Sequence, residues 1–215
     1  MARNIEEAWA EYEAFLEAHA PTAFANLAPG ASDAALATLE QELQQPLPRD
    51  LCTLLRLRDG QVKLGRACAF PGLRFLSCKR IAEEWLSWAR FRDNETEDGL
   101  GMLDSHASAL DPGVQDVYTH PGWIPLLKLG DRSDYIGVDT VPAEGGILGQ
   151  VINFGRDEDQ HFVASPSLAE LIDFSLEELR KAMEGCSLKL DKLNGLALLS
   201  RAAEARREAS QDGSS

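Results

Sequence analysis

The spacing of apolar residues changes near residue 61, and this change limits the possible folds of the 215-residue chain more than any other feature. Before it, apolar side chains recur every three or four residues, the spacing that places them on one face of a helix. After it, many of them alternate with polar residues, which is typical of strands. Helices followed by a run of strands predict an α+β protein.

The expected elements follow from this spacing and from turn residues. Three helices are expected first: one over residues 5–16 that ends before Pro21, one capped by Ser32 or Asp33, and one from Leu47 to Gly60. Strands are expected over residues 62–64, 73–76, 123–126, 135–138, 149–154 and 161–164. Further helices are expected after Ser77, over 168–179 and over 188–199. Residues 91–118 are polar and acidic and predict a long loop, functional or mobile.

The charge balance favours some partners over others. The chain has 35 Asp and Glu residues against 21 Lys and Arg, a formal net charge of −14. Nonspecific binding to phosphate backbones needs clustered cations, so we expect no nucleic acid partner and favour a cationic protein. The N-terminal residues lack the apolar core of a signal peptide, and no apolar run approaches the roughly 18 residues that span a bilayer. We therefore expect a cytoplasmic protein without a membrane partner.

The charge is unevenly distributed. Residues 51–80 hold seven Lys and Arg residues and one acidic residue, whereas the segments on either side are acidic. The simplest interpretation is that this basic segment pairs with acidic elements inside the fold. The acidic stretch before Trp123 and the region 119–174 would then remain as the negative surface, where a partner is expected.

No pattern of catalytic or metal-binding residues stands out. The four cysteines form no Cys-x-x-Cys pair, and the four histidines occur singly, so neither a metal site nor a cofactor is expected. Four acidic residues between strands are best interpreted as solvated turn and edge residues; they are Asp131, Asp134, Asp139 and Glu144. A hydrolase built from scattered carboxylates or histidines is a minority hypothesis, and we expect no enzyme.

Two other places allow alternative interpretations. Gly60 suits the left-handed backbone after a helix, whereas Asp59 and Gln61 beside it either satisfy the last helical carbonyls or face a groove. Trp123 is either a core residue, which is favoured, or an exposed anchor for a partner.

The order of several short motifs resembles the SUKH superfamily, which includes a fungal cell-wall-synthesis regulator and many bacterial immunity proteins. The resemblance covers residues 28–175 and rests on Pro29-Gly30-Ala31-Ser32, Glu40, Leu47-Pro48-Arg49-Asp50-Leu51, Asp59-Gly60-Gln61, Phe70-Pro71-Gly72, Phe75-Leu76-Ser77, Ile81-Ala82-Glu83-Glu84-Trp85, Trp123-Ile124-Pro125, Gly130-Asp131, Tyr135-Ile136-Gly137-Val138-Asp139 and Gly149-Gln150-Val151-Ile152. Each motif is weak alone, but their order and spacing are specific.

The resemblance implies a single domain with a mixed, largely antiparallel sheet packed with N-terminal and C-terminal helices. We expect an N-terminal helix packed on the domain (1–27), the SUKH-like domain (28–185) with an acidic insertion near 91–118, and a C-terminal helical extension with a polar tail (186–215). The leucines of the extension are expected to dock on the domain or on a second copy, which would make a homodimer.

The resemblance also implies a binding protein. The leading hypothesis is an immunity protein that neutralises a cognate bacterial toxin, such as a cationic nuclease, by direct contact. The alternative is a non-enzymatic regulatory scaffold of a signalling or cell-wall-synthesis pathway. The candidate contact residues are Asp59, Gln61, Trp123, Asp131, Asp134, Tyr135, Asp139 and Glu144.

Overall fold

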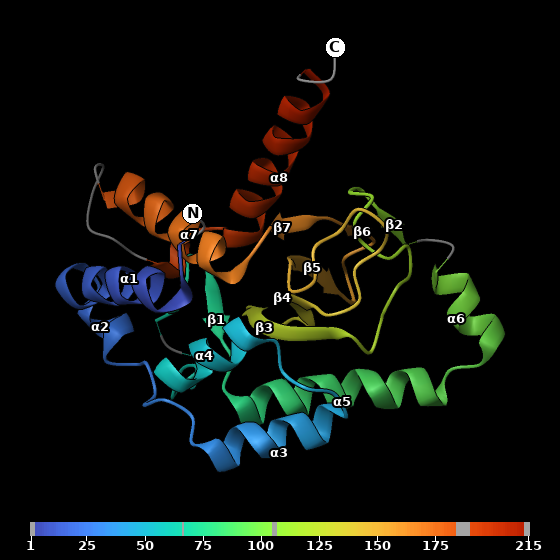
Figure 1. Cartoon of the computed structure of the whole chain (residues 1–215), viewed down its shortest axis with the longest axis horizontal. Coiled ribbons are helices and arrows are strands. Elements are labelled where there is room, and N and C mark those ends of the chain that lie inside the picture. Colours follow the sequence, from blue (N-terminus) through green and yellow to red (C-terminus); the bar gives the residue numbers. More distant parts are fainter. Residues whose placement is uncertain (1–2, 66, 105–106, 184–189, 213–215) are drawn as a thin grey trace.

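The chain folds into a sheet covered by helices (Figure 1). The computed structural model describes residues 3–65, 67–104, 107–183 and 190–212. Within these ranges it contains eight α-helices and a five-stranded antiparallel sheet. The predicted α+β class with a largely antiparallel sheet is confirmed.

The helices begin where the sequence offers a cap. They are α1 (Ile5–His19), α2 (Pro21–Phe24), α3 (Asp33–Leu43), α4 (Arg49–Leu57), α5 (Cys78–Asn94), α6 (Glu97–Asp104), α7 (Leu168–Met183) and α8 (Gly195–Asp212), with a 3-10 turn over Leu190–Lys192. The side chains of Asn4, Ser32 and Ser77 accept hydrogen bonds from free amides in the first turns of α1, α3 and α5. Pro21 ends α1 as expected, but it also begins α2.

The main sheet has the strand order β1-β3-β4-β5-β7. The strands are β1 (Leu73–Phe75), β2 (Ser108–Ala109), β3 (Trp123–Leu129), β4 (Asp134–Asp139), β5 (Val151–Gly155), β6 (Gln160–His161) and β7 (Val163–Ser165), and β2 and β6 form a separate parallel pair. Every residue of β4 and β5 is buried. Because both faces of these strands are covered, they lack the alternation of a half-exposed sheet.

The N-terminal helix packs on the rest of the domain through an aromatic cluster. The rings of Trp9 and Tyr12 from α1 lie against Phe70, with centroids 6.2 and 5.1 Å apart, and Phe75 of β1 joins them. The Tyr12 hydroxyl donates to the Ala69 carbonyl at 2.7 Å, so this buried polar group is satisfied.

The C-terminal helix docks on the sheet edge and then projects away from the body (Figure 1). Leu199 and Ala203 of α8 are buried, and the Arg206 guanidinium donates to the Val163 and Ala164 carbonyls of β7 at 2.7 and 2.9 Å. Leu199, one of the leucines expected to dock, therefore contacts the domain of the same chain. The start of the expected helix, at Leu188, lies outside the described residues.

Two expectations about secondary structure are wrong. Residues 62–64 form no strand: the Gln61 side chain accepts from the amides of Ala69 and Phe75, which folds the chain back on itself after a single bridge to Leu27. The expected loop over 91–118 contains the end of α5, all of α6 and strand β2. Phe91 extends α5 because its ring packs on Trp88, with centroids 5.7 Å apart.

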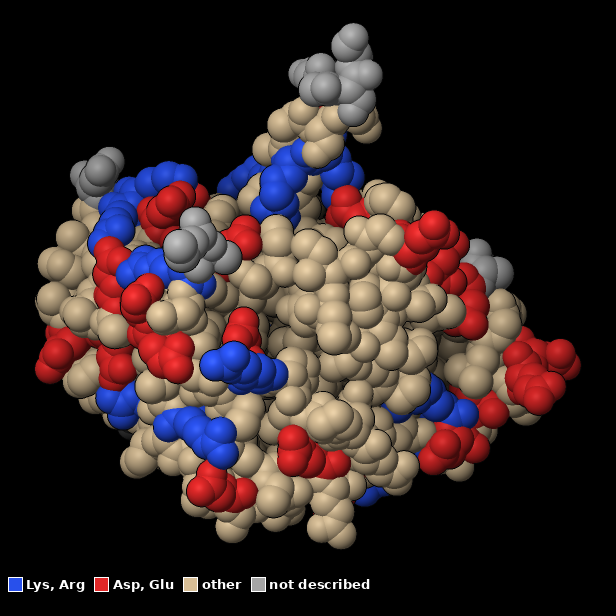
Figure 2. Space-filling model, in the orientation of Figure 1, with Lys and Arg blue, Asp and Glu red and all other residues tan. Residues whose placement is uncertain are grey.

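Five of the seven basic residues of segment 51–80 pair with acidic residues of the described chain, as expected. The ion pairs are Arg56 with Asp33, Arg58 with Glu13, Arg74 with Asp131, and Lys79 and Arg80 with Glu83. Carboxylates gather elsewhere, for example over α6 at the right of Figure 2. Among the described helices, none is long and apolar enough to cross a membrane.

Candidate functional site: a groove between α3 and α5

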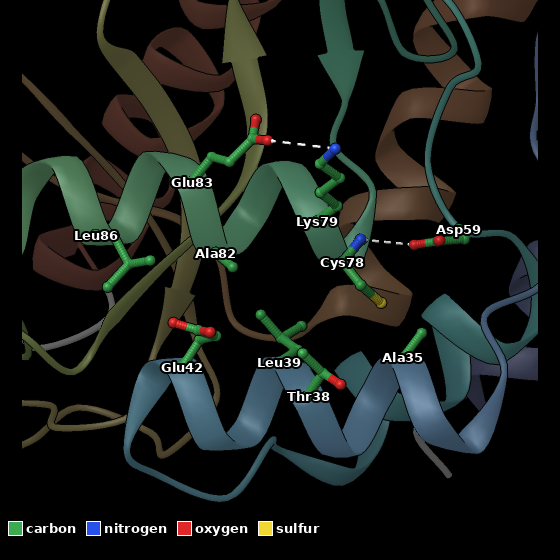
Figure 3. A pocket seen from close by; sticks show the side chains of 10 residues that line it. All are labelled: Ala35, Thr38, Leu39, Glu42, Asp59, Cys78, Lys79, Ala82, Glu83 and Leu86. Carbon is green, nitrogen blue, oxygen red and sulfur yellow. Dashed lines mark hydrogen bonds and ion pairs between the residues drawn. The ribbon is translucent and has the colours of Figure 1, made fainter.

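A groove of about 430 Å³ lies between α3 and α5 (Figure 3). It is lined by Ala35, Thr38, Leu39 and Glu42 of α3, by Cys78, Lys79, Ala82, Glu83 and Leu86 of α5, and by Asp59. The two helices run in the same direction, with Ala35 opposite Cys78 at one end and Glu42 opposite Leu86 at the other. The groove is therefore an open channel along two helices.

The helical repeat of each segment produces this channel. On α3, the buried stripe of Leu36, Leu39 and Leu43 faces the core, and Thr38 and Glu42 lie on the adjacent stripe. On α5, Ile81 and Trp85 are buried and the neighbouring stripe carries Ala82 and Leu86. Each helix thus presents a second, weaker apolar stripe beside the one that packs into the core.

Asp59 and Gly60 fix the start of α5 beside the groove. The Asp59 carboxylate accepts a hydrogen bond from the Cys78 amide at 2.6 Å, which satisfies one free donor of the helix N-terminus. Gly60 has φ +69°, and a Cβ at this position would lie 2.4 Å from backbone atoms of Leu76 and Ser77. The close approach requires glycine, as the sequence predicts, and it sets where α5 begins.

The groove has an apolar floor and a mostly acidic rim. Leu39, Ala82 and Leu86 form apolar lining, whereas the charged lining consists of three carboxylates and one ammonium group. The Glu42 side chain has no ion pair or hydrogen bond with any other residue that the structure describes. The rim can therefore attract a cationic group.

The Cys78 thiol is not prepared for nucleophilic chemistry. Burial raises the pKa of Cys78, and the hydrogen bond and negative charge of Asp59 raise it further. The thiol stays protonated near neutral pH, and thiolate is the reactive form. The groove therefore offers no reactive thiolate near neutral pH.

Of the eight candidate contact residues, Asp59 alone lines the groove. Gln61 is 5% exposed and forms three hydrogen bonds from its side chain to backbone groups, including a donation from Nε2 to the Ala67 carbonyl at 3.0 Å. The Gln61 side chain therefore holds the loop that follows Gly60 in place and does not face solvent.

Trp123 and Tyr135 are core residues. Trp123 is 2% exposed and packs against His161, with ring centroids 5.0 Å apart, so the favoured core interpretation is confirmed. Tyr135 is buried, and its hydroxyl donates to Glu84 at 2.6 Å. Burial is the main cause that raises the pKa of Tyr135.

Asp134 and Asp139 are not solvated, and that interpretation is wrong for both. Each is fully buried because β4 is the central strand and both faces of the sheet are covered there. Asp139 accepts from the Val141 amide and from the Gln150 side chain, both at 2.9 Å, and Asp134 accepts from the Asp157 amide at 2.9 Å. Burial raises the pKa of Asp139 against these hydrogen bonds.

Asp131 and Glu144 are exposed, as expected of turn residues, but they lie at opposite ends of β4. Asp131 pairs with Arg74 at 2.7 Å. The structure therefore does not gather the candidate residues into one contact surface. Within the described ranges, no group of three or more His, Cys, Asp or Glu side chains is arranged to hold a metal ion.

The sequence interpretation missed the α3 and α5 stripes that form the groove. Their signal is a second set of small or apolar residues, Ala35 and Thr38 on one helix and Ala82 and Leu86 on the other, one position away from the core leucines and aromatics. Such residues are common on any amphipathic helix, and they form a groove only because α3 packs beside α5.

Comparisons with known proteins point to fungal regulators. A family model described as the SMI1 / KNR4 family (SUKH-1) matches residues 30–173. The chain is 35% identical over 179 residues to "Cell wall biosynthesis/cell cycle regulator smi1" of Schizosaccharomyces pombe, an alignment that covers 78% of this chain and 34% of that protein.

Two further relatives carry similar names. "Glucan synthesis regulatory protein" of Neurospora crassa is 26% identical, with 81% of this chain and 38% of that protein covered. "Cell wall assembly regulator SMI1" of Saccharomyces cerevisiae is 25% identical, with 77% and 38% covered. The chain thus spans about a third of the length of these relatives.

These relatives contradict the leading functional hypothesis. Toxin neutralisation was expected from the bacterial members of the superfamily, but the similar proteins are fungal and are named as regulators of the cell wall or of glucan synthesis. The resemblance is to the superfamily as a whole, so it does not separate the functions of its members. The regulatory alternative is the better supported one.

Proposed function

The chain belongs to the SMI1/KNR4 family (SUKH-1), and from that premise we propose that it is a non-enzymatic regulatory scaffold that acts in cell-wall synthesis or its signalling by holding a partner protein. The observation that carries the proposal is the groove between α3 and α5. Its open shape, apolar floor and charged rim are the features of a protein-binding surface.

The names of the relatives support the regulatory part of the proposal. The fission yeast and budding yeast proteins are called regulators, and none of the three names describes a chemical reaction. Because this chain matches about a third of each relative, it corresponds to one part of such a protein. A part that binds a partner is sufficient for a scaffold.

The placement of the polar residues supports the non-enzymatic part. A hydrolase would need two carboxylates or histidines that meet at an accessible pocket. His161 and Asp139 are fully buried, and Asp139 is already engaged by Val141 and Gln150. The accessible carboxylates of the groove lie beside a thiol whose raised pKa keeps it protonated near neutral pH, so the groove offers no reactive thiolate.

The test exchanges the matching segment of the fission yeast regulator for this chain. A strain that lacks the segment is compared with a strain that carries the exchange, on medium containing an inhibitor of β-glucan synthesis. If the chain is a regulatory scaffold of this kind, the exchange restores growth that the deletion loses. Growth no better than that of the deletion, with the exchanged protein present in equal amount, would reject the proposal.

A further inference from the structure

We propose that the groove binds an amphipathic helix of a partner protein, with one apolar face toward the floor and Lys or Arg residues toward the Glu42 side of the rim. This inference rests on the proposed function and names the chemistry of the partner. It follows from three properties of the groove: the backbone groups around it, the size of its lining side chains and its charge.

The backbone around the groove favours a helical guest over an extended one. Nine of the ten lining residues belong to helices, where most amides and carbonyls are paired within the helix, and the first-turn amides of Ala35 and Cys78 donate to Ser32 and Asp59. The remaining residue, Asp59, accepts from Cys78 and donates its own amide to the Pro29 carbonyl at 3.1 Å. An extended peptide would bury unpaired amides and carbonyls here, whereas a helix pairs its own.

The lining side chains leave room for helix-to-helix packing. Ala35, Thr38 and Ala82 are small, so the backbone of a guest helix can approach closely, while the partly exposed Leu86 provides an apolar contact and the buried Leu39 closes the floor. From Ala35 to Glu42 the channel follows about two turns of α3, or about 10 Å. Two turns accommodate apolar anchors at positions i, i+3, i+4 and i+7 of a guest, which is the pattern of helix-in-groove recognition.

Charge selects among amphipathic helices. Helix α3 carries Asp33, Glu40 and Glu42 and has no Lys or Arg. Of the two lining glutamates, Glu83 is paired with Arg80 at 2.7 Å, whereas Glu42 has no partner among the described side chains. A guest cation beside Glu42 would form an ion pair without breaking one that already exists. A guest carboxylate at the same place would be repelled.

The experiment measures binding of three fluorescent peptides to the full chain by anisotropy. Each peptide has about 18 residues, enough to form a helix. The first has a Leu and Ala face flanked by Lys; the second has the same face flanked by Glu; the third has the composition of the first in an order that destroys the apolar face. We expect the first to bind at least about tenfold more tightly than either of the others.

Three variants locate the binding site. Ala82→Trp fills the channel and should weaken binding of the first peptide at least about tenfold, because the guest loses its place on the floor. Glu42→Lys should weaken it about fivefold and reduce its dependence on salt. Glu17→Lys makes the same charge change on an exposed face of α1 and serves as the matched control, with binding unchanged.

The results separate a specific site from general attraction between a cation and an acidic protein. Equal binding of the first and third peptides, equal effects of Glu42→Lys and Glu17→Lys, or tighter binding of the Glu-flanked peptide would overturn the proposal. Thermal unfolding of each variant shows whether the fold persists, and the exposed Glu42→Lys change keeps the test valid if Ala82→Trp fails to fold. Failure here together with successful segment exchange would reject the basic helix and leave the scaffold function standing.

Discussion

The Asp59 carboxylate links the chain just after α4 to the start of α5. It accepts from the Cys78 amide at the start of α5, and its charge also acts on the Cys78 thiol. The same contact therefore stabilises the helix beside the groove and suppresses formation of the thiolate. A polar residue after a helix is easily interpreted as surface, but here its role depends on a residue 19 positions away.

This contact predicts an order of cysteine reactivity. Cys78 is 4% exposed and its pKa is raised by burial and by Asp59, whereas Cys52 is partly exposed on α4. With iodoacetamide at neutral pH, we expect Cys52 to be alkylated at least about tenfold faster than Cys78, since the thiolate is the reacting form. Mass spectrometry of proteolytic peptides measures both rates. Equal rates would show that Cys78 is more accessible or more acidic than this contact allows.

Two histidines beside Trp123 give the fold a dependence on pH. His161 is fully buried and His120 is partly buried, and burial is the main cause that lowers the pKa of each. Both ring nitrogens of His161 lack a hydrogen-bond partner among the described residues. Protonation would place an unpaired charge in the core, which is strongly unfavourable.

Stability should therefore fall as the pH is lowered. In the unfolded chain these imidazoles bind protons at their ordinary pKa of about 6.5, above their pKa in the folded chain, so protonation favours unfolding. The stability that depends on these imidazoles being neutral is fully present above about pH 6.5, and it is lost as the pH falls below that value. The raised pKa values of Asp139 and Glu158 act in the opposite direction, but mainly at lower pH, where carboxylates titrate.

Urea unfolding across this pH range measures the effect. We expect the free energy of unfolding to decrease from about pH 7.5 to pH 5.5, where unperturbed histidine gains its charge. His161→Gln should reduce the decrease, because it removes the buried imidazole. A stability that rises toward pH 5.5 would contradict the buried neutral state of His161.

Among the elements, the turn between α4 and β1 depends on one glycine. Gly60 has φ +69°, and a Cβ added there would lie 2.4 Å from backbone atoms of Leu76 and Ser77. We expect Gly60→Ala to lower the free energy of unfolding by about 2 kcal/mol or more, because both strain and steric overlap oppose the methyl group.

Gly65→Ala is the matched control, because no atom lies within 4 Å of a Cβ at that position. Its effect should lie within about 0.5 kcal/mol of zero, as is usual for substitutions on the surface. Chemical unfolding of both variants decides the comparison. Equal losses would mean that the turn tolerates a side chain at residue 60.

Helix α8 protects the edge strand β7. Besides the bonds from Arg206 to β7 carbonyls, Arg207 pairs with Asp111 at 3.1 Å, and the same Asp111 oxygen accepts from the Val163 amide. We expect Leu199→Asp to release α8, because it places a charge at a position 3% exposed, and to speed hydrogen exchange of the β7 amides.

Mass spectrometry of exchanged peptides measures this effect. Ala205→Asp, on an exposed position of the same helix, should leave exchange in β7 unchanged, and the α1 amides report whether the whole domain is affected. Unchanged protection of β7 in Leu199→Asp would show that the helix does not guard this edge.

The sequence predicted the elements whose signals are local. Ser32 and Ser77 cap the helices they precede, and the apolar stripes of α1 and α7 mark these helices correctly. It failed where a contact between distant residues decides the structure. The bend after Gln61 depends on its bonds to Ala69 and Phe75, and the burial of β4 depends on its place in the middle of the sheet.

The groove also depends on contacts between residues that are distant in the sequence. Its two halves come from α3 and α5, which are separated by α4 and β1 along the chain, and each half resembles an ordinary amphipathic helix. Residues chosen for polarity at turns, such as Asp131 and Glu144, do not meet in space. The site became visible only through the packing of the two helices.

Across the whole molecule, the excess negative charge is unevenly distributed over the surface. Five of the seven basic residues of segment 51–80 form ion pairs with Asp33, Glu13, Asp131 and Glu83. The net charge of −14 therefore acts through acidic surfaces, of which the rim at Glu42 is one. This arrangement favours encounter with a basic partner and repels other acidic proteins.

If the proposed function is right, the chain acts by holding a partner in the groove between α3 and α5. The decisive measurement is growth of the fission yeast exchange strain on an inhibitor of β-glucan synthesis when the exchanged segment carries Ala82→Trp. We expect this strain to grow no better than the deletion, while a strain with Glu17→Lys grows like the unmodified exchange. Equal growth of the Ala82→Trp strain and the unmodified exchange, at equal amounts of folded protein, would show that the groove is not the binding site.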